Sequence, residues 1–206
     1  MTPNVLDRLV TLFSKLPGIG KKSAGRIVYH ILDSSPALAE NLAKELSGLH
    51  KAIRRCEVCG GFTEADPAQS QILCAVCADT NRDHSVICVI ESAQDMRIIE
   101  EGREFNGVYH VLGGLIAPLE GVGPDNLSIG KLIARVHSAN GKQVKEIILA
   151  LNPTVEGDTT ALYLQKQLKE LPIEITRLAS GMPVGGNIEY IDKLTLSRSF
   201  KGRIKL

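Results

Sequence analysis

The chain has 206 residues with the composition of an ordinary globular protein, 44% apolar and 23% charged. This composition excludes a disordered, collagen-like or coiled-coil protein, and no apolar run approaches the roughly 18 residues of a membrane helix. The net charge is only +1, from 24 basic and 23 acidic side chains, so the total charge points to no partner. Aromatic residues make up 4% and tryptophan is absent, which argues against a surface that stacks single-stranded bases.

The charge is unevenly distributed along the chain. Residues 1–55 hold nine basic and four acidic side chains, a net charge of +5, which leaves −4 for the remainder. A basic N-terminal part before a mildly acidic body suggests nucleic acid at one end, the alternative being a solvated helical surface. Asp7 and Arg8 interrupt the first apolar stretch, so no secretory signal is expected. A reducing compartment follows, where cysteines are more often metal ligands than disulfides.

Helical spacing of apolar residues dominates the N-terminal quarter. It predicts helices at residues 4–16, 23–32 and 36–55, the last with a point of interruption at Gly48. Residues 56–83 then show four cysteines and little periodicity. A small module held together by something other than a hydrophobic core is expected there.

From residue 84 onward, short apolar strands alternate with helices. Strands are expected at residues 85–91, 107–112, 145–151 and 173–178, and helices at residues 93–101, 129–139 and 159–171. Such alternation predicts a parallel sheet covered by helices on both faces. The fold class is therefore α/β with several modules, divided at residues 1–55, 56–83, 84–178 and 179–206.

Two glycines one residue apart, Gly18 and Gly20, lie between the first two predicted helices. They allow a tight turn whose amides face outward at a helix start, where a phosphate can bind. Lys22 and Arg26 are four residues apart and share one helix face, with Lys21 beside them. This pattern resembles the helix-hairpin-helix family, which implies a grip on the DNA backbone without base reading. The alternative is a plain turn with solvated lysines.

The four cysteines form two close pairs, Cys56 with Cys59 and Cys74 with Cys77. Four thiolates at this spacing can close a tetrahedron around one zinc ion and leave no open coordination position, so the zinc is expected to be structural. Zinc binding contributes about 10–16 kcal/mol of apparent free energy in small modules of this kind. Disulfides or redox thiols are the alternatives. Cys88 lies within an apolar strand and is expected in the core.

Acidic residues follow two of the predicted strands, where open α/β sheets bind their ligands. The arrangement resembles the toprim fold of topoisomerases, primases and small nucleases, which holds magnesium with such acids. Glu91 and Glu156 match that pattern, but Asn152 and Thr154 replace its two aspartates. Magnesium prefers anionic oxygens, so catalysis is not expected. With Asp158, the remaining acids are interpreted as a surface for packing or for a partner protein.

All modules in this order resemble the RecR family of bacterial recombination mediators. Further matching segments are Tyr-His-Val-Leu-Gly-Gly at 109–114, Asn-Pro-Thr-Val-Glu-Gly at 152–157 and Met-Pro-Val-Gly-Gly at 182–186. The resemblance implies a non-enzymatic DNA-repair protein that acts with RecO and RecF to promote RecA loading on single-stranded or gapped DNA. It also implies ring-like homotetramers or dimers, one zinc per chain, contacts with RecO and action in the bacterial cytoplasm at the nucleoid.

Two other functions remain open at this point. One is a magnesium-dependent nuclease or topoisomerase-like enzyme of the toprim type. The other is a zinc-stabilised adaptor that binds only proteins.

Overall fold

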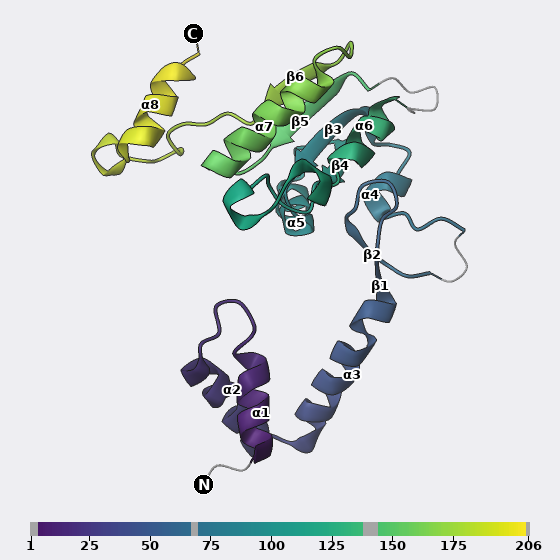
Figure 1. Cartoon of the computed structure of the whole chain (residues 1–206), viewed down its shortest axis with the longest axis vertical. Coiled ribbons are helices and arrows are strands. Elements are labelled where there is room, and N and C mark those ends of the chain that lie inside the picture. The colour runs from purple at the N-terminus through teal and green to yellow at the C-terminus, as the bar shows by residue number, and fades with distance from the viewer. Residues whose placement is uncertain (1–3, 67–69, 138–143, 205–206) are drawn as a thin grey trace. The chain divides into compact units, whose positions relative to one another are not determined.

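The computed structural model describes residues 4–66, 70–137 and 144–204. The chain divides into two compact units, Met1–Ile53 and Arg54–Leu206, which are described separately. Figure 1 labels the elements of both units.

The first unit is helical. It contains α1 (Asn4–Phe13), α2 (Lys21–Asp33) and α3 (Pro36–Ala52). The start of α2 lies two residues before the expected one, because Gly20 adopts extended backbone angles (φ −78°, ψ 166°) and serves as its N-cap. Gly48 does not interrupt α3, which instead ends at Ala52, before the short strand β1 (Ile53–Arg55).

The helices of this unit keep much of their apolar surface in contact with solvent. Ala24 and Val28 are its fully buried side chains within the described residues, whereas Leu12 is 58% and Leu32 is 61% exposed. The helical periodicity thus marks faces that a single copy of the unit leaves largely uncovered.

The second unit begins with the small two-stranded sheet of β1 and β2 (Phe62–Glu64) and the one-turn helix α4 (Ala75–Ala78). A four-stranded parallel sheet follows, in the order β4-β3-β5-β6. Its strands are β3 (Asp83–Ile90), β4 (Gly107–Val111), β5 (Glu146–Ala150) and β6 (Glu174–Arg177). The expected α/β class with a parallel sheet is confirmed.

Helices cover both faces of this sheet (Figure 1). The helices α6 (Ile129–His137) and α7 (Val155–Leu168) bury Leu132 and Leu164 against one face, and α5 (Ala93–Gly102) packs against the other. Side chains of the central strand β3 alternate between the two: Val89 enters the first layer and Cys88 the second. Cys88 is 3% exposed, as expected for a core residue. The end of the helix expected at 129–139 lies outside the described residues.

The start of α7 lies four residues before the expected one, and this changes the setting of the acidic residues. Thr154 caps the helix by accepting a hydrogen bond from the Gly157 amide at 3.1 Å. A Cβ at position 157 would lie 1.9 Å from the Asn152 carbonyl oxygen, so only glycine fits there. Glu156 and Asp158 therefore belong to the first turn of α7 and not to a loop.

The C-terminal segment contains helical elements that its sequence pattern did not predict. It contains a single 3-10 turn, η3 (Ile188–Tyr190), and the helix α8 (Lys193–Lys201). Asp192 caps α8 by accepting hydrogen bonds from the amides of Leu194 and Thr195, both at 2.9 Å. Among the described residues, no helix combines the length and apolar character needed to cross a membrane.

Candidate functional site

The two-glycine turn is an exposed hairpin between α1 and α2. Gly18 has a φ of +77°, a backbone conformation that favours glycine, and a hydrogen bond of 3.1 Å from the Ile19 amide to the Leu16 carbonyl closes the turn. Gly20 supplies the first helical carbonyl, to which the Ala24 amide donates at 2.9 Å. Gly20 has no side chain to cap α2, so the first amides of the helix can receive an external acceptor.

The predicted cations are placed at the start of α2. Lys21 and Lys22 occupy its first turn, Arg26 follows one turn later, and all three are exposed. None forms an ion pair with a carboxylate in the described part of the chain. Positive charge at a helix N-terminus is repelled by the helix dipole, and a bound anion would remove that repulsion. The structure therefore places the five predicted hairpin residues together on an accessible corner.

The four paired cysteines converge in the second unit. The sulfurs of Cys56, Cys59, Cys74 and Cys77 all lie within 4.8 Å of one another, and Cys59 Sγ is 3.6 Å from Cys74 Sγ. Tetrahedral zinc with Zn–S bonds of about 2.3 Å requires sulfurs about 3.8 Å apart, so the donor set fits one zinc ion. The centre is a closed site of four cysteines, and the predicted structural zinc is confirmed.

Local backbone geometry forms this centre. The Cys56 amide donates to the Gly61 carbonyl at 2.7 Å, and the Gly60 amide donates to the Cys56 carbonyl at 2.9 Å. Gly60 has a φ of +77°, which allows the tight knuckle between Cys56 and Cys59. Cys74 begins the second pair as the N-cap residue of α4.

The thiols of this centre do not titrate independently. Hydrogen bonding from Cys59, and next from Cys74 and Cys77, holds the pKa of Cys56 far below its usual value. Hydrogen bonding to Cys56, and next to Cys59 and Cys74, holds the pKa of Cys77 far above it. Four thiolates at this separation repel one another, so full deprotonation requires a cation. Burial raises the pKa of the separate Cys88 thiol to about 12, which keeps it protonated and unreactive.

The acidic residues at the strand ends have different partners. The Asn152 side-chain amide donates to Glu91 Oε2 at 2.9 Å, so a neutral donor occupies the carboxylate that a toprim metal would use. Asp158 is held by two arginines, Arg177 at 2.6 Å and Arg198 at 3.0 Å. Among the described residues, the cysteine cluster is the one group of three or more metal-ligating side chains close enough to hold an ion.

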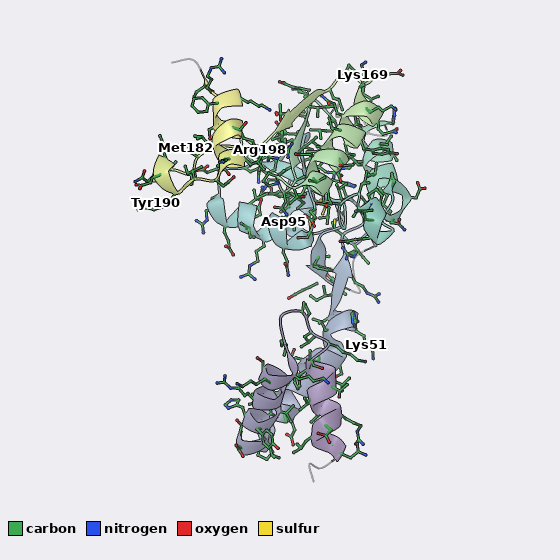
Figure 2. The ribbon with its side chains drawn as sticks, turned by 60° about the vertical axis from the view of Figure 1, so that its left-hand side comes forward. Lys51, Asp95, Lys169, Met182, Tyr190 and Arg198 are labelled. Atoms are coloured by element: carbon green, nitrogen blue, oxygen red, sulfur yellow. The ribbon has the colours of Figure 1, made fainter. Side chains whose placement is uncertain are left out.

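Sequence reasoning missed the role of Asp158 in fixing the C-terminal segment. Arg198 belongs to α8 and lies 40 residues away along the chain. Figure 2 shows Arg198 at the junction of α8 with the sheet domain, and Met182 and Tyr190 in the preceding part of the segment. The available sequence signals for this helix were Asp192, a good N-cap residue, and the helical spacing of Leu194 and Ser197. In the structure these two side chains line one groove together with Arg198.

Sequence reasoning also missed an ionic network beside the sheet. Arg82 pairs with Glu100 of α5, and the Tyr109 hydroxyl donates to Glu100 Oε1 at 2.5 Å. Hydrogen bonding to Arg82 holds the pKa of Glu100 below its usual value, although burial opposes this. Burial, followed by the hydrogen bond to Glu100, raises the pKa of Tyr109. These contacts join the end of the zinc-binding module to the sheet.

An exposed two-glycine hairpin, a closed four-cysteine centre and a four-stranded parallel sheet together define a multi-module α/β protein. Family models match each part: RecR helix-hairpin-helix at residues 6–49, the four-cysteine zinc finger domain of RecR at 53–79, toprim domain at 85–179 and RecR C-terminal at 181–204.

Relatives with the printed name Recombination protein RecR match nearly the whole chain. The one from Treponema denticola is 54% identical over 202 residues, covering 98% of this chain and 99% of the relative. The one from Moorella thermoacetica is 47% identical over 204 residues, covering 99% and 98%. The one from Chlorobium chlorochromatii is 46% identical over 200 residues, covering 96% and 95%.

The chain belongs to the RecR family of recombination proteins, and the resemblance found in its motifs is confirmed. Its role lies in recombination repair.

Proposed function

We propose that the protein is a non-enzymatic mediator that holds the DNA backbone through the α1–α2 hairpin. Together with RecO and RecF it promotes RecA loading on single-stranded or gapped DNA. The observation that carries this proposal is the exposed corner in which Gly18 and Gly20 leave helix amides accessible beside Lys21, Lys22 and Arg26. Amides and cations at a helix start recognise phosphate, which is common to every DNA sequence.

The proposal includes a homo-oligomer, either a ring-like tetramer or a dimer. One hairpin that contacts a few phosphates binds non-specifically, with dissociation constants on the order of 10⁻⁴–10⁻⁶ M at physiological salt. Several hairpins on one assembly add about 10²–10⁴ in avidity. Support comes from apolar side chains left uncovered in the first unit, including Val5 at 55% and Leu16 at 49% exposure. Apolar faces of this kind are typical of protein interfaces.

The absence of catalysis is supported by the contact at the strand ends. Magnesium-dependent phosphoryl transfer needs several anionic oxygens around the metal. Here the Asn152 amide donates to Glu91 at 2.9 Å, and Thr154 uses its hydroxyl to cap α7. Neither residue supplies the negative charge that the replaced aspartates would supply.

The hairpin is tested by a double charge reversal, Lys22→Glu with Arg26→Glu. Fluorescence anisotropy with labelled single-stranded and gapped DNA measures affinity at several salt concentrations. The matched control is Lys166→Glu with Lys169→Glu, which changes the net charge equally at exposed positions at the end of α7. We expect the first variant to lose DNA binding while its far-ultraviolet circular dichroism is unchanged, and the control to bind almost normally.

Equal affinity of the hairpin variant and the unmodified protein at low salt would show that the hairpin is not the DNA contact. Failure of the protein to bind DNA at any salt concentration would favour the zinc-stabilised adaptor that binds only proteins.

The toprim domain match at residues 85–179 makes a magnesium-dependent nuclease or topoisomerase-like enzyme the second candidate. It is tested by incubating the protein with magnesium and labelled DNA or RNA. Cleavage or relaxation that disappears in Glu91→Gln would support the enzyme and contradict the mediator. No turnover in either form is expected.

We propose that the acidic residues Glu91, Glu156 and Asp158 contribute to a surface that binds RecO. The protein is proposed to act in the bacterial cytoplasm, at the nucleoid during repair. Glu156 is the cleanest probe, because it is exposed and has no ion pair among the described residues. Reversal of Asp158 would also release two arginines. We expect Glu156→Lys to weaken capture of RecO. Unchanged capture after reversal of all three acids would remove this part of the proposal.

A further inference from the structure

Arg135 is a half-buried cation whose role the fold alone does not explain. It lies on α6 and donates a hydrogen bond from Nη1 to the Tyr109 carbonyl at 2.7 Å. It forms no ion pair with a carboxylate in the described part of the chain. A half-buried arginine without a carboxylate partner is stabilised by negative charge nearby, because water screens its charge only in part.

The nearest strand connects Arg135 to the zinc centre. Arg135 binds the Tyr109 carbonyl of β4, and two residues later the Val111 amide donates to the Cys59 carbonyl at 2.8 Å. Val76, between the second pair of cysteines, packs against the core layers on both faces of the sheet. The cysteine knuckle therefore contacts β4, and β4 contacts α6, within one compact unit.

The electrostatic environment of Arg135 agrees with this geometry. Burial lowers the pKa of Arg135, and the four cysteine sulfurs, Cys77 first, oppose that shift. One turn earlier on α6, Lys131 lines a cavity of about 310 Å³ together with Cys56 and Cys59. The same cavity is lined by Arg55 and by one acid, Glu57.

A zinc ion bound by four thiolates leaves a net charge of about −2 on the centre, from the formal charges of metal and ligands. Cys56, Cys59 and Cys74 are no more than 3% exposed, so water screens little of that charge. Lys131 and Arg55 are exposed, whereas Arg135 is half-buried. Its positive charge is therefore the least screened of the three.

We propose that Arg135 is the counter-charge of the zinc-loaded thiolate cluster, and that through it zinc occupancy stabilises the α6–β4 side of the sheet domain. Arg135 is a positioning residue, because it does not bind the metal itself. Outer groups that stabilise metal ligands typically change metal affinity 10–100-fold. The coupling is reciprocal: the charge of Arg135 strengthens zinc binding, and bound zinc stabilises the fold around Arg135.

The test compares zinc affinity in full-length variants by competition with a chromophoric chelator at neutral pH. Arg135→Met removes the charge and keeps a long apolar side chain, and Arg135→Lys keeps the charge. Arg97→Met is the matched control, because Arg97 is an exposed arginine of α5 that pairs with Glu101. We expect binding at least about tenfold weaker in Arg135→Met. Arg135→Lys is expected to keep most of the affinity, and Arg97→Met all of it. Unchanged affinity in Arg135→Met overturns the proposal.

A second measurement separates charge from packing. The thermal midpoint of unfolding is recorded for each variant with zinc and after chelation. Loss of a counter-charge lowers the midpoint of the zinc-loaded form more than that of the zinc-free form, so the gain on adding zinc becomes smaller. Equal lowering of both midpoints means that Arg135 only packs, which contradicts the proposal.

Cobalt titration, followed by thiolate-to-metal absorbance, supplies the same comparison where zinc-free protein is too unstable to melt. The Arg135→Met variant should bind cobalt more weakly by a similar factor, and unchanged cobalt affinity is a negative result. No DNA is present in these measurements, so their outcome is independent of the hairpin.

Discussion

His110 gives the fold a built-in sensitivity to acid. The ring is 2% exposed and its Nε2 lies 3.0 Å from the Ser128 carbonyl, which can only accept a hydrogen bond, so Nε2 carries the proton. Burial lowers the pKa of His110 from 6.5 to about 4. The second ring nitrogen, Nδ1, is buried and has no hydrogen-bond partner among the described residues. Protonation of this ring would place an unpaired charge inside the protein.

The sign and size of the effect follow from this shift. In the unfolded chain His110 takes up a proton near pH 6.5, but in the folded chain it does so only near pH 4. Its contribution to stability is therefore fully present above pH 6.5 and decreases as the pH falls towards 4. With about 1.4 kcal/mol for each pKa unit, the loss is about 2 kcal/mol at pH 5 and about 3 kcal/mol at pH 4.

The perturbation is His110→Gln, which keeps a side-chain N–H donor and removes the titration. The free energy of unfolding is measured by urea denaturation at pH 8 and pH 5 with saturating zinc. The pH-dependent loss should be about 2 kcal/mol smaller in the variant than in the unmodified protein. Acid effects from Glu100 and the cysteines are present in both proteins and cancel in the difference. His137→Gln, at an exposed position of α6, is the control. The same pH dependence in all three proteins would refute the reasoning.

Three further substitutions test other contacts. The buried Ile116 amide donates to Thr160 Oγ1 at 2.9 Å, and Thr160→Val leaves this amide without an acceptor. Urea denaturation should show that the free energy of unfolding falls by about 1–3 kcal/mol in Thr160→Val and by much less in Thr160→Ser. Equal stability of Thr160→Val and the unmodified protein would contradict this. Asn152→Asp places a second carboxylate beside Glu91 and should lower the melting temperature of the zinc-loaded protein in magnesium-free buffer but not in millimolar magnesium; no response to magnesium contradicts this. Arg198→Ala removes the partly exposed ion pair with Asp158, which contributes at most about 1 kcal/mol. Limited proteolysis should therefore release α8 faster, while the melting temperature of the sheet domain stays the same. An unchanged rate of proteolysis would contradict this.

Features set by neighbouring residues could be predicted from the sequence. The zinc centre depends on two short cysteine spacings, and the hairpin depends on Gly18 and Gly20, so both patterns are complete within a few residues. The strands of the parallel sheet were found to within two residues at each end, because a buried strand is an uninterrupted apolar run.

Features that depend on distant residues could not be predicted. Asp158 looked like a free acid, but Arg198, 40 residues further on, binds it. No local pattern marks Arg135, because its hydrogen-bond partner, the Tyr109 carbonyl of β4, lies 26 residues earlier in the chain. The early start of α7 was missed, although Thr154 is a good N-cap residue. Helical periodicity in the first unit identified the apolar faces but not what covers them.

The outer edge of β4 has a consequence for handling the protein without its metal. This strand borders the sheet, and its outward-facing carbonyls at Gly107 and Tyr109 accept hydrogen bonds from arginine side chains, while its Val111 amide donates to the Cys59 carbonyl. An unprotected border strand is a template on which another chain can add a strand. Loss of the metal is expected to loosen the cysteine knuckle, and with it the contact between Cys59 and Val111 that covers part of this edge. We therefore expect metal-depleted protein to aggregate more readily through this strand than zinc-loaded protein does.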